Sequence, residues 1–272
     1  NVQDIFPDVA VELGMLTNQR AISAARRLER SLYEAADAVT VLSEDQARNV
    51  RAKTTRPENV HIIPNFVDTS RVTTVDRMTE YRRTHNLADE LVVMYSGNVG
   101  FSQSFHLVEA AAKHFADRPD VHFVINGEGA ARASVDQWAG PLPNVTVSDF
   151  APREKVSDVL GTADLHLILL SQGLAQSSTP SKLYGILAAG RPVLASIDLG
   201  SDADVVIRRS GAGLTVPPED PDAFIQALEV LLSDRNELAK LGQKAHDFID
   251  QLITPDQQAE AYERLFLQLK AM

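Results

Sequence analysis

The segment Gly97–Asn98–Val99–Gly100 has residue types and a position that suit phosphate binding. It follows the apolar run Leu91–Tyr95, which predicts a buried strand, and precedes a helical pattern that starts near Ser104. Glycines let a backbone approach an anion closely, and the free N–H groups at a helix start favour negative charge. The spacing differs from the dinucleotide fingerprint GxGxxG, and the sequence has no P-loop GKS or GKT. A tight turn that needs glycine is the alternative interpretation.

Asn126–Gly127–Glu128–Gly129 forms a second corner of the same kind, after the predicted strand Val121–Ile125. In open α/β sheets, ligands bind beyond the carboxyl ends of the strands. Two glycine-containing corners at one edge therefore support each other as a predicted binding site. For Glu128, a solvated acid in a turn is the alternative.

A third segment, residues 178–193, combines a cation with a helix start. Ser181 or Thr179 is predicted to cap this helix and to donate to an anion. Lys182 falls in the first turn, where a positive charge is unfavourable against the helix dipole. Its position is better explained if Lys182 binds a phosphate, and a surface lysine beside an ordinary cap is the alternative. Gly190 is predicted to end the helix.

Composition excludes several other chemistries. The 272 residues carry 26 Lys and Arg against 37 Asp and Glu, a formal charge of −11, so we expect no binding to nucleic acid. The absence of cysteine excludes disulfides and thiolate chemistry. The seven histidines form no HExxH motif or close pair, so we expect no metal site.

An α/β framework is predicted to position the three segments. Short apolar runs alternate with helical patterns, which indicates βαβ units and a parallel sheet covered on both faces. The predicted strands are Ala38–Leu42, Val60–Ile63, Leu91–Tyr95, Val121–Ile125, Val145–Val147, Leu165–Leu170 and Pro192–Ala195. The predicted helices are Ile22–Ala36, Phe105–Phe115, Val156–Leu160, Leu183–Ala189, Asp220–Leu232, Arg235–Ile249 and Pro255–Leu269.

A domain junction is predicted near residue 65, where the chain leaves a strand through Pro64 and Asn65. The first 64 residues contain too few strands for a sheet of their own. Because the chain starts with Asn1 rather than Met, we expect a preceding part to be missing. No apolar run reaches the ~20 residues that span a bilayer, and the first residues lack a basic segment followed by an apolar one, so we expect no signal peptide here.

Together these segments resemble the retaining glycosyltransferases of family 4, which have the two-domain GT-B fold. The resemblance rests on ordered motifs over nearly the whole chain, at Ala36–Ser43, Ile63–Asp68, Gly97–Gly100, Asn126–Gly129, Ala163–Leu165, Pro180–Val193 and Gly213–Pro218. Ser181–Gly185 with Ala188–Pro192 looks most like enzymes that build bacterial surface polysaccharides, and Gln3–Asp8 fits the same branch.

The resemblance implies two Rossmann-like domains that face a cleft. Residues 1–64 would be the end of a truncated acceptor domain, and residues 65–254 the complete donor domain. Residues 255–272 would hold the helix that crosses back toward the acceptor domain. A cytoplasmic location is expected, with the full-length protein peripheral at the inner face of the membrane.

The sequence departs from the family pattern at two charged features. Many members carry a Glu-x7-Glu pair, for which the matching residues here are Ser177 and Gly185. Members often carry an Arg and a Lys after the first glycine corner, whereas residues 98–103 contain no cation. Lys182 and its helix start would then hold more of the diphosphate. Arg191 lies past the far end of that helix and is a poor candidate.

The reaction implied is transfer of a sugar from a nucleoside diphosphate sugar, UDP-sugar favoured, to a saccharide or lipid-linked acceptor, with retention and without a metal or other cofactor. Stabilising the diphosphate leaving group would be the main electrostatic contribution. Lys182 is the predicted stabiliser of the diphosphate, and the catalytic residues proper stay unassigned. The residues expected at the donor are Gly97, Asn98, Gly100, Gly127, Glu128, Gly129, Phe150, Ala151, Gly173, Leu174, Ser177, Thr179, Ser181, Lys182, Leu183 and Gly185.

Two other functions stay open at this point. A sugar-nucleotide epimerase would use similar Rossmann-like halves, and a nucleotide-binding fragment would bind without transfer. If the rest of the first domain is absent, the helix Ile22–Ala36 and the strand Ala38–Leu42 expose apolar faces. We therefore expect self-association through residues 1–64.

Overall fold

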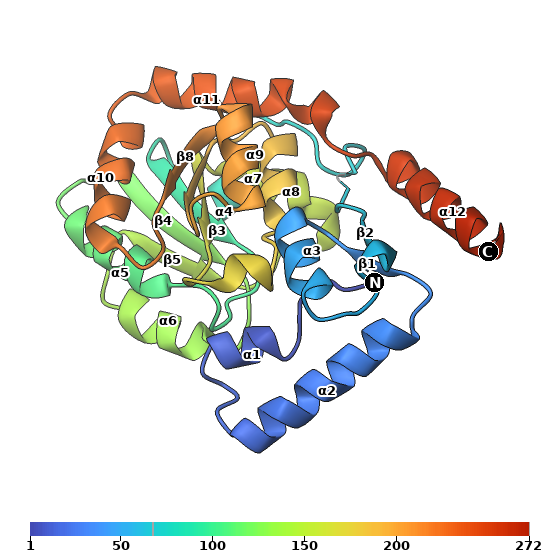
Figure 1. Ribbon diagram of the computed structural model, residues 1–272. Helices are drawn as coiled ribbons and strands as arrows, with labels where there is room; N and C mark the ends of the chain where they lie inside the picture. The colour runs from blue at the N-terminus through green and yellow to red at the C-terminus, as the bar shows by residue number, and fades with distance from the viewer. Residues whose placement is uncertain (67, 272) are drawn as a thin grey trace.

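The computed structural model describes residues 1–66 and 68–271, which form two parallel sheets with helices around them (Figure 1). The strands are β1 (Val39–Val41), β2 (Val60–Ile62), β3 (Leu91–Ser96), β4 (Val121–Asn126), β5 (Val145–Ser148), β6 (Leu165–Leu169), β7 (Val193–Ser196) and β8 (Gly213–Val216). The α-helices are α1 (Asp8–Glu12), α2 (Gln19–Ala35), α3 (Glu44–Arg51), α4 (Glu80–Thr84), α5 (Phe105–His114), α6 (Arg132–Ala139), α7 (Val156–Thr162), α8 (Lys182–Ala188), α9 (Asp202–Ser210), α10 (Pro221–Leu232), α11 (Arg235–Asp247) and α12 (Pro255–Ala271). Short 3-10 helices lie at η1 (Pro57–Asn59), η2 (Arg153–Lys155), η3 (Leu174–Gln176) and η4 (Ile249–Gln251).

The larger sheet has six parallel strands in the order β5-β4-β3-β6-β7-β8. Starting at β3, the chain adds β4 and then β5 on one side of the sheet. It then crosses back to place β6 on the other side of β3, and β7 and β8 follow on that side. The loops that follow β3 and β6 therefore leave the sheet toward opposite sides. In parallel α/β sheets this reversal opens a crevice at the carboxyl ends of the strands, where ligands bind.

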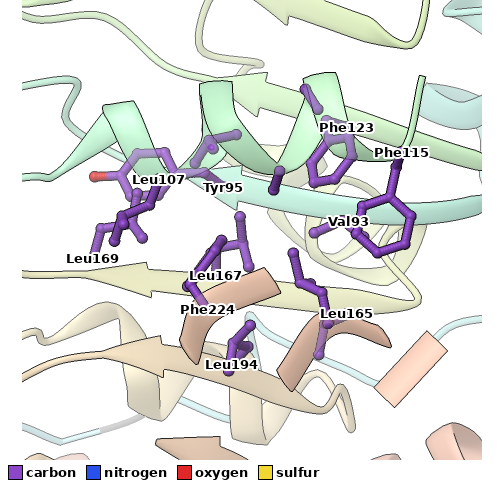
Figure 2. Close-up of a cluster of buried hydrophobic side chains, with 14 of the residues drawn as sticks. Val93, Tyr95, Leu107, Phe115, Phe123, Leu165, Leu167, Leu169, Leu194 and Phe224 are labelled. Atoms are coloured by element: carbon purple, nitrogen blue, oxygen red, sulfur yellow. The ribbon is translucent and has the colours of Figure 1, made fainter. Parts of the chain in front are cut away.

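Helices cover both faces of this sheet, and each face has its own apolar cluster. Leu107 of α5 and Phe224 of α10 pack on the face that includes Val93, Phe123 and Leu167 (Figure 2). The opposite face packs against α4 and α7 at one end and against α8 and α9 at the other. α11 contributes to clusters on both faces, which places it across one end of the sheet (Figure 1).

The smaller sheet pairs β1 with β2 in parallel, in the register Val39 with Val60. α2 and α3 supply the buried Tyr33, Ala47 and Val50 to its core. α12 contacts this part of the chain, because Tyr262 Oη accepts a hydrogen bond of 2.9 Å from Asn1 Nδ2. Gln258 Nε2 also donates to the Pro64 carbonyl at 2.8 Å. The proposed domain boundaries near residues 65 and 254 stay a prediction.

The predicted α/β class and parallel sheet are confirmed, and each predicted strand has a counterpart. The sequence patterns missed β8, which is only four residues long and starts at Gly213. They also missed α3 and α6, short helices whose apolar residues are too few for a clear period. Such elements depend on contacts with the rest of the fold rather than on local pattern.

Candidate nucleotide-binding site

The two glycine corners extend the pairing of β3 with β4 beyond the strands. Gly97 N donates to the Asn126 carbonyl at 2.9 Å, and Val99 N donates to the Glu128 carbonyl at 2.8 Å. Tyr95 Oη donates to the Asn98 carbonyl at 2.6 Å, which attaches the first corner to the end of β3. The corners are thus one hydrogen-bonded unit at the carboxyl edge of the sheet.

Glycine is required in the second corner by its packing against the first. Gly127 has φ of +155° and Gly129 has φ of +153°. A Cβ atom on Gly127 would lie 1.9 Å from the Gly97 carbonyl oxygen, and one on Gly129 would lie 2.3 Å from the Val99 carbonyl oxygen. These two glycines therefore serve the contact between the corners.

Lys182 reaches the first corner from α8. Its Nζ lies 3.7 Å from the centroid of the Tyr95 ring, a cation–π distance. A Cβ atom on Gly97 would lie 2.6 Å from the same Nζ, so Gly97 leaves room for the lysine. The loop itself has no cation, and the structure supplies one from a helix more than eighty residues further along the chain.

The ammonium of Lys182 has no acidic partner within the described part of the chain. Among residues 1–66 and 68–271, no carboxylate forms an ion pair with it. Burial lowers the pKa of Lys182 to about 7, and no neighbouring carboxylate opposes that shift. A desolvated cation without a counter-ion gains free energy when an anion binds beside it.

A cavity of about 540 Å³ lies beside this ammonium, at the point where the strand order reverses. That volume suits a small-molecule ligand, for which pockets span about 300–1,000 Å³. Tyr95 and Leu169 line it from the ends of β3 and β6. Its lining among the described residues comprises Phe66, Asp68, Val72, Tyr95, Gly97, Asn98, Gln103, Val156, Leu160, Leu169, Leu170, Ser178, Thr179, Pro180, Ser181, Lys182, Tyr184 and Gly185.

The cavity brings together part of the predicted donor set. The predicted residues that line it are Gly97, Asn98, Thr179, Ser181, Lys182 and Gly185. The predicted residues that do not line it are Gly100, Gly127, Glu128, Gly129, Phe150, Ala151, Gly173, Leu174, Ser177 and Leu183. Leu174 and Leu183 are buried in the apolar core. Phe150 is 51% exposed on the loop after β5, and Glu128 is an exposed residue of the second corner.

Sequence reasoning did not single out Tyr95, Gln103 or Tyr184 for the site. Tyr95 lies one residue before the end of β3. In the sequence it belongs to an apolar run, which predicts a buried strand residue and not a site residue. Its hydroxyl oxygen points away from the apolar cluster (Figure 2). A phenol next to a glycine corner is the signal that would have found it.

Helix α8 starts differently from the prediction. Ser181 is the N-cap residue, as one of the two predicted candidates, but its side chain makes no capping hydrogen bond. Thr179 Oγ1 instead donates to Ser43 Oγ at 3.4 Å. The Ser181 backbone adopts a helical φ and ψ, which turns the hydroxyl away from the N–H groups of the first turn. Gly190 ends the helix with φ of +65°, as predicted.

Ser177 contacts the N-terminal segment instead of the cavity. Its side chain is fully buried, and Ser177 Oγ donates to Glu12 Oε2 at 2.5 Å. The Ser177 carbonyl also accepts a hydrogen bond of 2.8 Å from Ile5 N. This residue ties residues 1–64 to the loop that precedes α8.

In the part of the chain that the structure describes, no three His, Asp or Glu side chains lie close enough together to hold a metal ion. Within the same residues, no helix has the length and apolar character needed to cross a bilayer.

Fold and site together define a GT-B glycosyltransferase architecture, and the comparison with family models agrees. Residues 77–248 match the model described as Glycosyl transferases group 1, and residues 15–71 match the model described as Glycosyltransferase Family 4. The first match alone covers more than half of the chain. The chain therefore belongs to the glycosyl transferases group 1 family.

Curated relatives are similar over most of this chain. A probable glycosyltransferase WbjE of Pseudomonas aeruginosa is 27% identical over 84% of this chain and 58% of its own length. A putative colanic acid biosynthesis glycosyl transferase WcaI of Escherichia coli K12 is 26% identical over 88% of this chain and 61% of its own length. The chain thus spans about three fifths of the length of these relatives.

Solved structures share the fold at low sequence identity. Anabaena HepE in complex with UDP superposes with a TM-score of 0.77 at 16% identity, over 100% of this chain and 71% of that one. Sucrose-phosphate synthase from Thermosynechococcus elongatus gives 0.76 at 20% identity, over 94% of this chain and 65% of that one.

Proposed function

We propose that this chain carries the donor site of a glycosyltransferase, which binds a nucleoside diphosphate sugar in the cavity between the first glycine corner and α8. The observation that carries the proposal is the unpaired Lys182 ammonium beside Gly97, at the reversal of strand order. The diphosphate is the part of the donor that this cation would bind.

Lys182 would also assist the chemical step. When the bond between the anomeric carbon and the β-phosphate oxygen breaks, the electron pair stays on that oxygen, so the leaving nucleoside diphosphate gains one negative charge beyond the two that the donor already carries. A preorganised cation stabilises this developing charge. Because partial burial already weakens its hydration, the ammonium loses less water than an exposed lysine would when it binds that charge. Retention at the anomeric carbon and the absence of a metal cofactor belong to this proposal.

We favour UDP as the nucleotide and a saccharide or lipid-linked acceptor. The support for UDP is the fold shared with HepE, whose structure contains UDP. The support for the acceptor is the naming of WcaI for colanic acid biosynthesis. The chain covers only part of such relatives, so binding of the donor by this chain and transfer by a whole enzyme are separate proposals.

Thermal unfolding with a panel of nucleotides tests the donor site. The panel contains UDP, GDP, ADP and their sugars. A ligand at about 100 times its dissociation constant adds about 2.7 kcal/mol to the free energy of unfolding. We expect UDP and a UDP-sugar to raise the midpoint while ADP does not. No shift with any nucleotide would contradict the proposal.

A transfer assay separates binding from catalysis. We expect this 272-residue chain to bind the nucleotide and to transfer little or no sugar to an added saccharide, since the smaller sheet has only two strands. Rapid transfer by this chain would show that residues 1–64 already suffice on the acceptor side.

A further inference from the structure

A second cavity, of about 570 Å³, lies at the opposite edge of the six-stranded sheet from the donor cavity. Leu91 at the start of β3 and Pro192 just before β7 line it, and α11 covers it with Leu238 and Gly242. α11 runs along this end of the sheet in Figure 1. None of its lining residues belongs to the donor cavity.

Basic side chains converge on this cavity from three elements. Arg77 comes from the loop before α4, Arg191 from the loop after α8, and Arg235 and His246 from α11. Asp164 is the one carboxylate among its described lining residues. In a chain with a formal charge of −11, this excess of cations is local to the cavity.

The carboxylate of Asp164 is already paired with two arginines of the fold. Its Oδ1 pairs with Arg77 Nε at 2.9 Å, and its Oδ2 pairs with the buried Arg82 Nη2 at 2.8 Å. Val92 N donates to the same Oδ2 at 2.8 Å. One carboxylate thus serves two guanidinium groups and a backbone N–H, and within the described part of the chain it forms no ion pair with Arg191.

Arg191 is the guanidinium without an ionic partner. Its Nη2 donates to the carbonyls of Val75 and Gly161 at 2.8 and 2.7 Å. Its Nε is buried and makes no hydrogen bond within the described part of the chain, and no described carboxylate pairs with it. Because two carbonyls already accept from Nη2 and Nε is buried, Nη1 is the nitrogen of this permanently protonated side chain that is left to donate to a bound acceptor.

Arg235 adds a second cation whose charge is only partly balanced. Its Nη2 donates to the Asp89 carbonyl at 2.6 Å, and its Nη1 lies 3.4 Å from Asp89 Oδ1. The same Oδ1 pairs more closely with Arg77, at 2.6 Å. The 84% exposed Asp89 is therefore shared between two arginines and screened by water.

We propose that this cavity binds a phosphorylated small molecule, with its phosphate held by Arg191 and Arg235. Guanidinium groups present forked N–H donors that match phosphate oxygens, which makes arginine well suited to this ligand. Leu91, Pro192 and Leu238 form an apolar wall that takes the organic part of the molecule. The volume is about as large as that of the donor cavity, which leaves room beyond a bare phosphate.

Isothermal titration with inorganic phosphate, at constant ionic strength and pH 8, tests this site. We expect saturable binding of one phosphate that Arg235→Gln weakens about tenfold, because a charge-assisted hydrogen-bond donor is lost. Arg264→Gln is the matched control, since Arg264 is an exposed arginine paired with Glu260 on α12 and does not line the cavity. We expect this control to bind phosphate as the unchanged chain does.

Two more variants keep the test independent of the donor site. Lys182→Gln removes the donor-site cation, so phosphate binding that survives it belongs elsewhere. Arg191→Gln should also weaken binding, and Arg235→Gln carries the test alone if the loss of the Arg191 hydrogen bonds prevents folding. The proposal is overturned if the unchanged chain shows no saturable binding, if Lys182→Gln abolishes it, or if Arg235→Gln leaves it intact. Nucleotide binding can fail without affecting any of these results.

Discussion

At the level of single residues, the proposed donor site depends most on the Lys182 ammonium. The first glycine corner lacks the cations that a diphosphate needs, and Lys182 brings one to it from α8. Tyr95 holds both parts together, because its ring faces the ammonium and its hydroxyl binds the Asn98 carbonyl. A phenylalanine at position 95 would keep the ring and lose the hydrogen bond to the corner.

The pH dependence of nucleotide binding follows from the lowered pKa of Lys182, which is about 7 in the free chain. Bound diphosphate favours the protonated ammonium, so binding takes up a proton above that pKa. We expect the affinity for UDP to fall about tenfold per pH unit between pH 7.5 and 9. The second pKa of a terminal phosphate is about 6, so the ligand does not titrate in this range.

Calorimetric titration of UDP at pH 7.5, 8.2 and 9 measures this effect. Lys182→Arg is the comparison, because a guanidinium stays charged over the whole range and its affinity should be constant. An affinity of the unchanged chain that stays flat from pH 7.5 to 9 would speak against a role for the Lys182 ammonium.

At the level of elements, the glycine corners behave as one unit. Gly127→Ala would place a Cβ atom 1.9 Å from the Gly97 carbonyl oxygen, so the corners must separate. We expect a loss of about 2–4 kcal/mol in the free energy of unfolding, together with weaker nucleotide binding. Denaturant titration measures the first effect and calorimetry the second.

Gly200→Ala is the control for backbone strain alone. Gly200 also has a positive φ, +84°, but a Cβ atom there would meet nothing within 4 Å. We expect a cost of about 1–2 kcal/mol, from strain without a clash, and unchanged nucleotide binding. Equal losses for the two variants would mean that the contact between the corners adds nothing.

The elements could be predicted from the sequence better than the site could. Buried strands such as Leu91–Ser96 are apolar at nearly every position, so composition alone identifies them. The corner glycines were found because a glycine pair after a strand is a local signal. Their contact with each other, and the burial of Ser177 against Glu12, depend on pairs far apart in the sequence.

Lys182 shows how a prediction can rest on an incomplete reason. Its type and position in the first turn suggested a phosphate ligand, although the serine cap assumed beside it does not form. The physical reason is the approach to Gly97 and Tyr95, which only the fold provides. The cavity at the opposite edge was not predicted at all, because its arginines come from three separate segments.

For the whole molecule, the smaller part of the chain has an apolar surface on α2 that no other described residue covers. The expectation that the strand Ala38–Leu42 also exposes an apolar face is wrong, because Val39, Val41 and Leu42 are buried, the first two against α2 and α3. Leu28 and Leu32 of α2 are each 61% exposed, and Met15 just before this helix is 65% exposed. Figure 1 shows α2 set apart from the sheets. Exposed apolar surface of this kind favours association with another protein surface. We therefore keep the prediction that the chain self-associates through residues 1–64.

Light scattering over a range of protein concentrations tests this association. A chain with both Leu28→Glu and Leu32→Glu should have a lower mean mass at high concentration than the unchanged chain. Val230→Glu is the control, because Val230 is 66% exposed on α10, away from that surface. A monomer at every concentration for the unchanged chain would refute the prediction.

The binding of UDP to the unchanged chain and to Lys182→Ala, measured by calorimetry at pH 7, tests the central claim most directly. Loss of a charge-assisted contact costs about 1.5–3 kcal/mol, so we expect the affinity to fall about 10- to 100-fold. Lys240→Ala is the control, because Lys240 is an exposed lysine of α11 paired with Glu237. It should bind UDP as tightly as the unchanged chain. Equal affinities for all three chains, or no binding to any of them, would contradict a donor site built around Lys182.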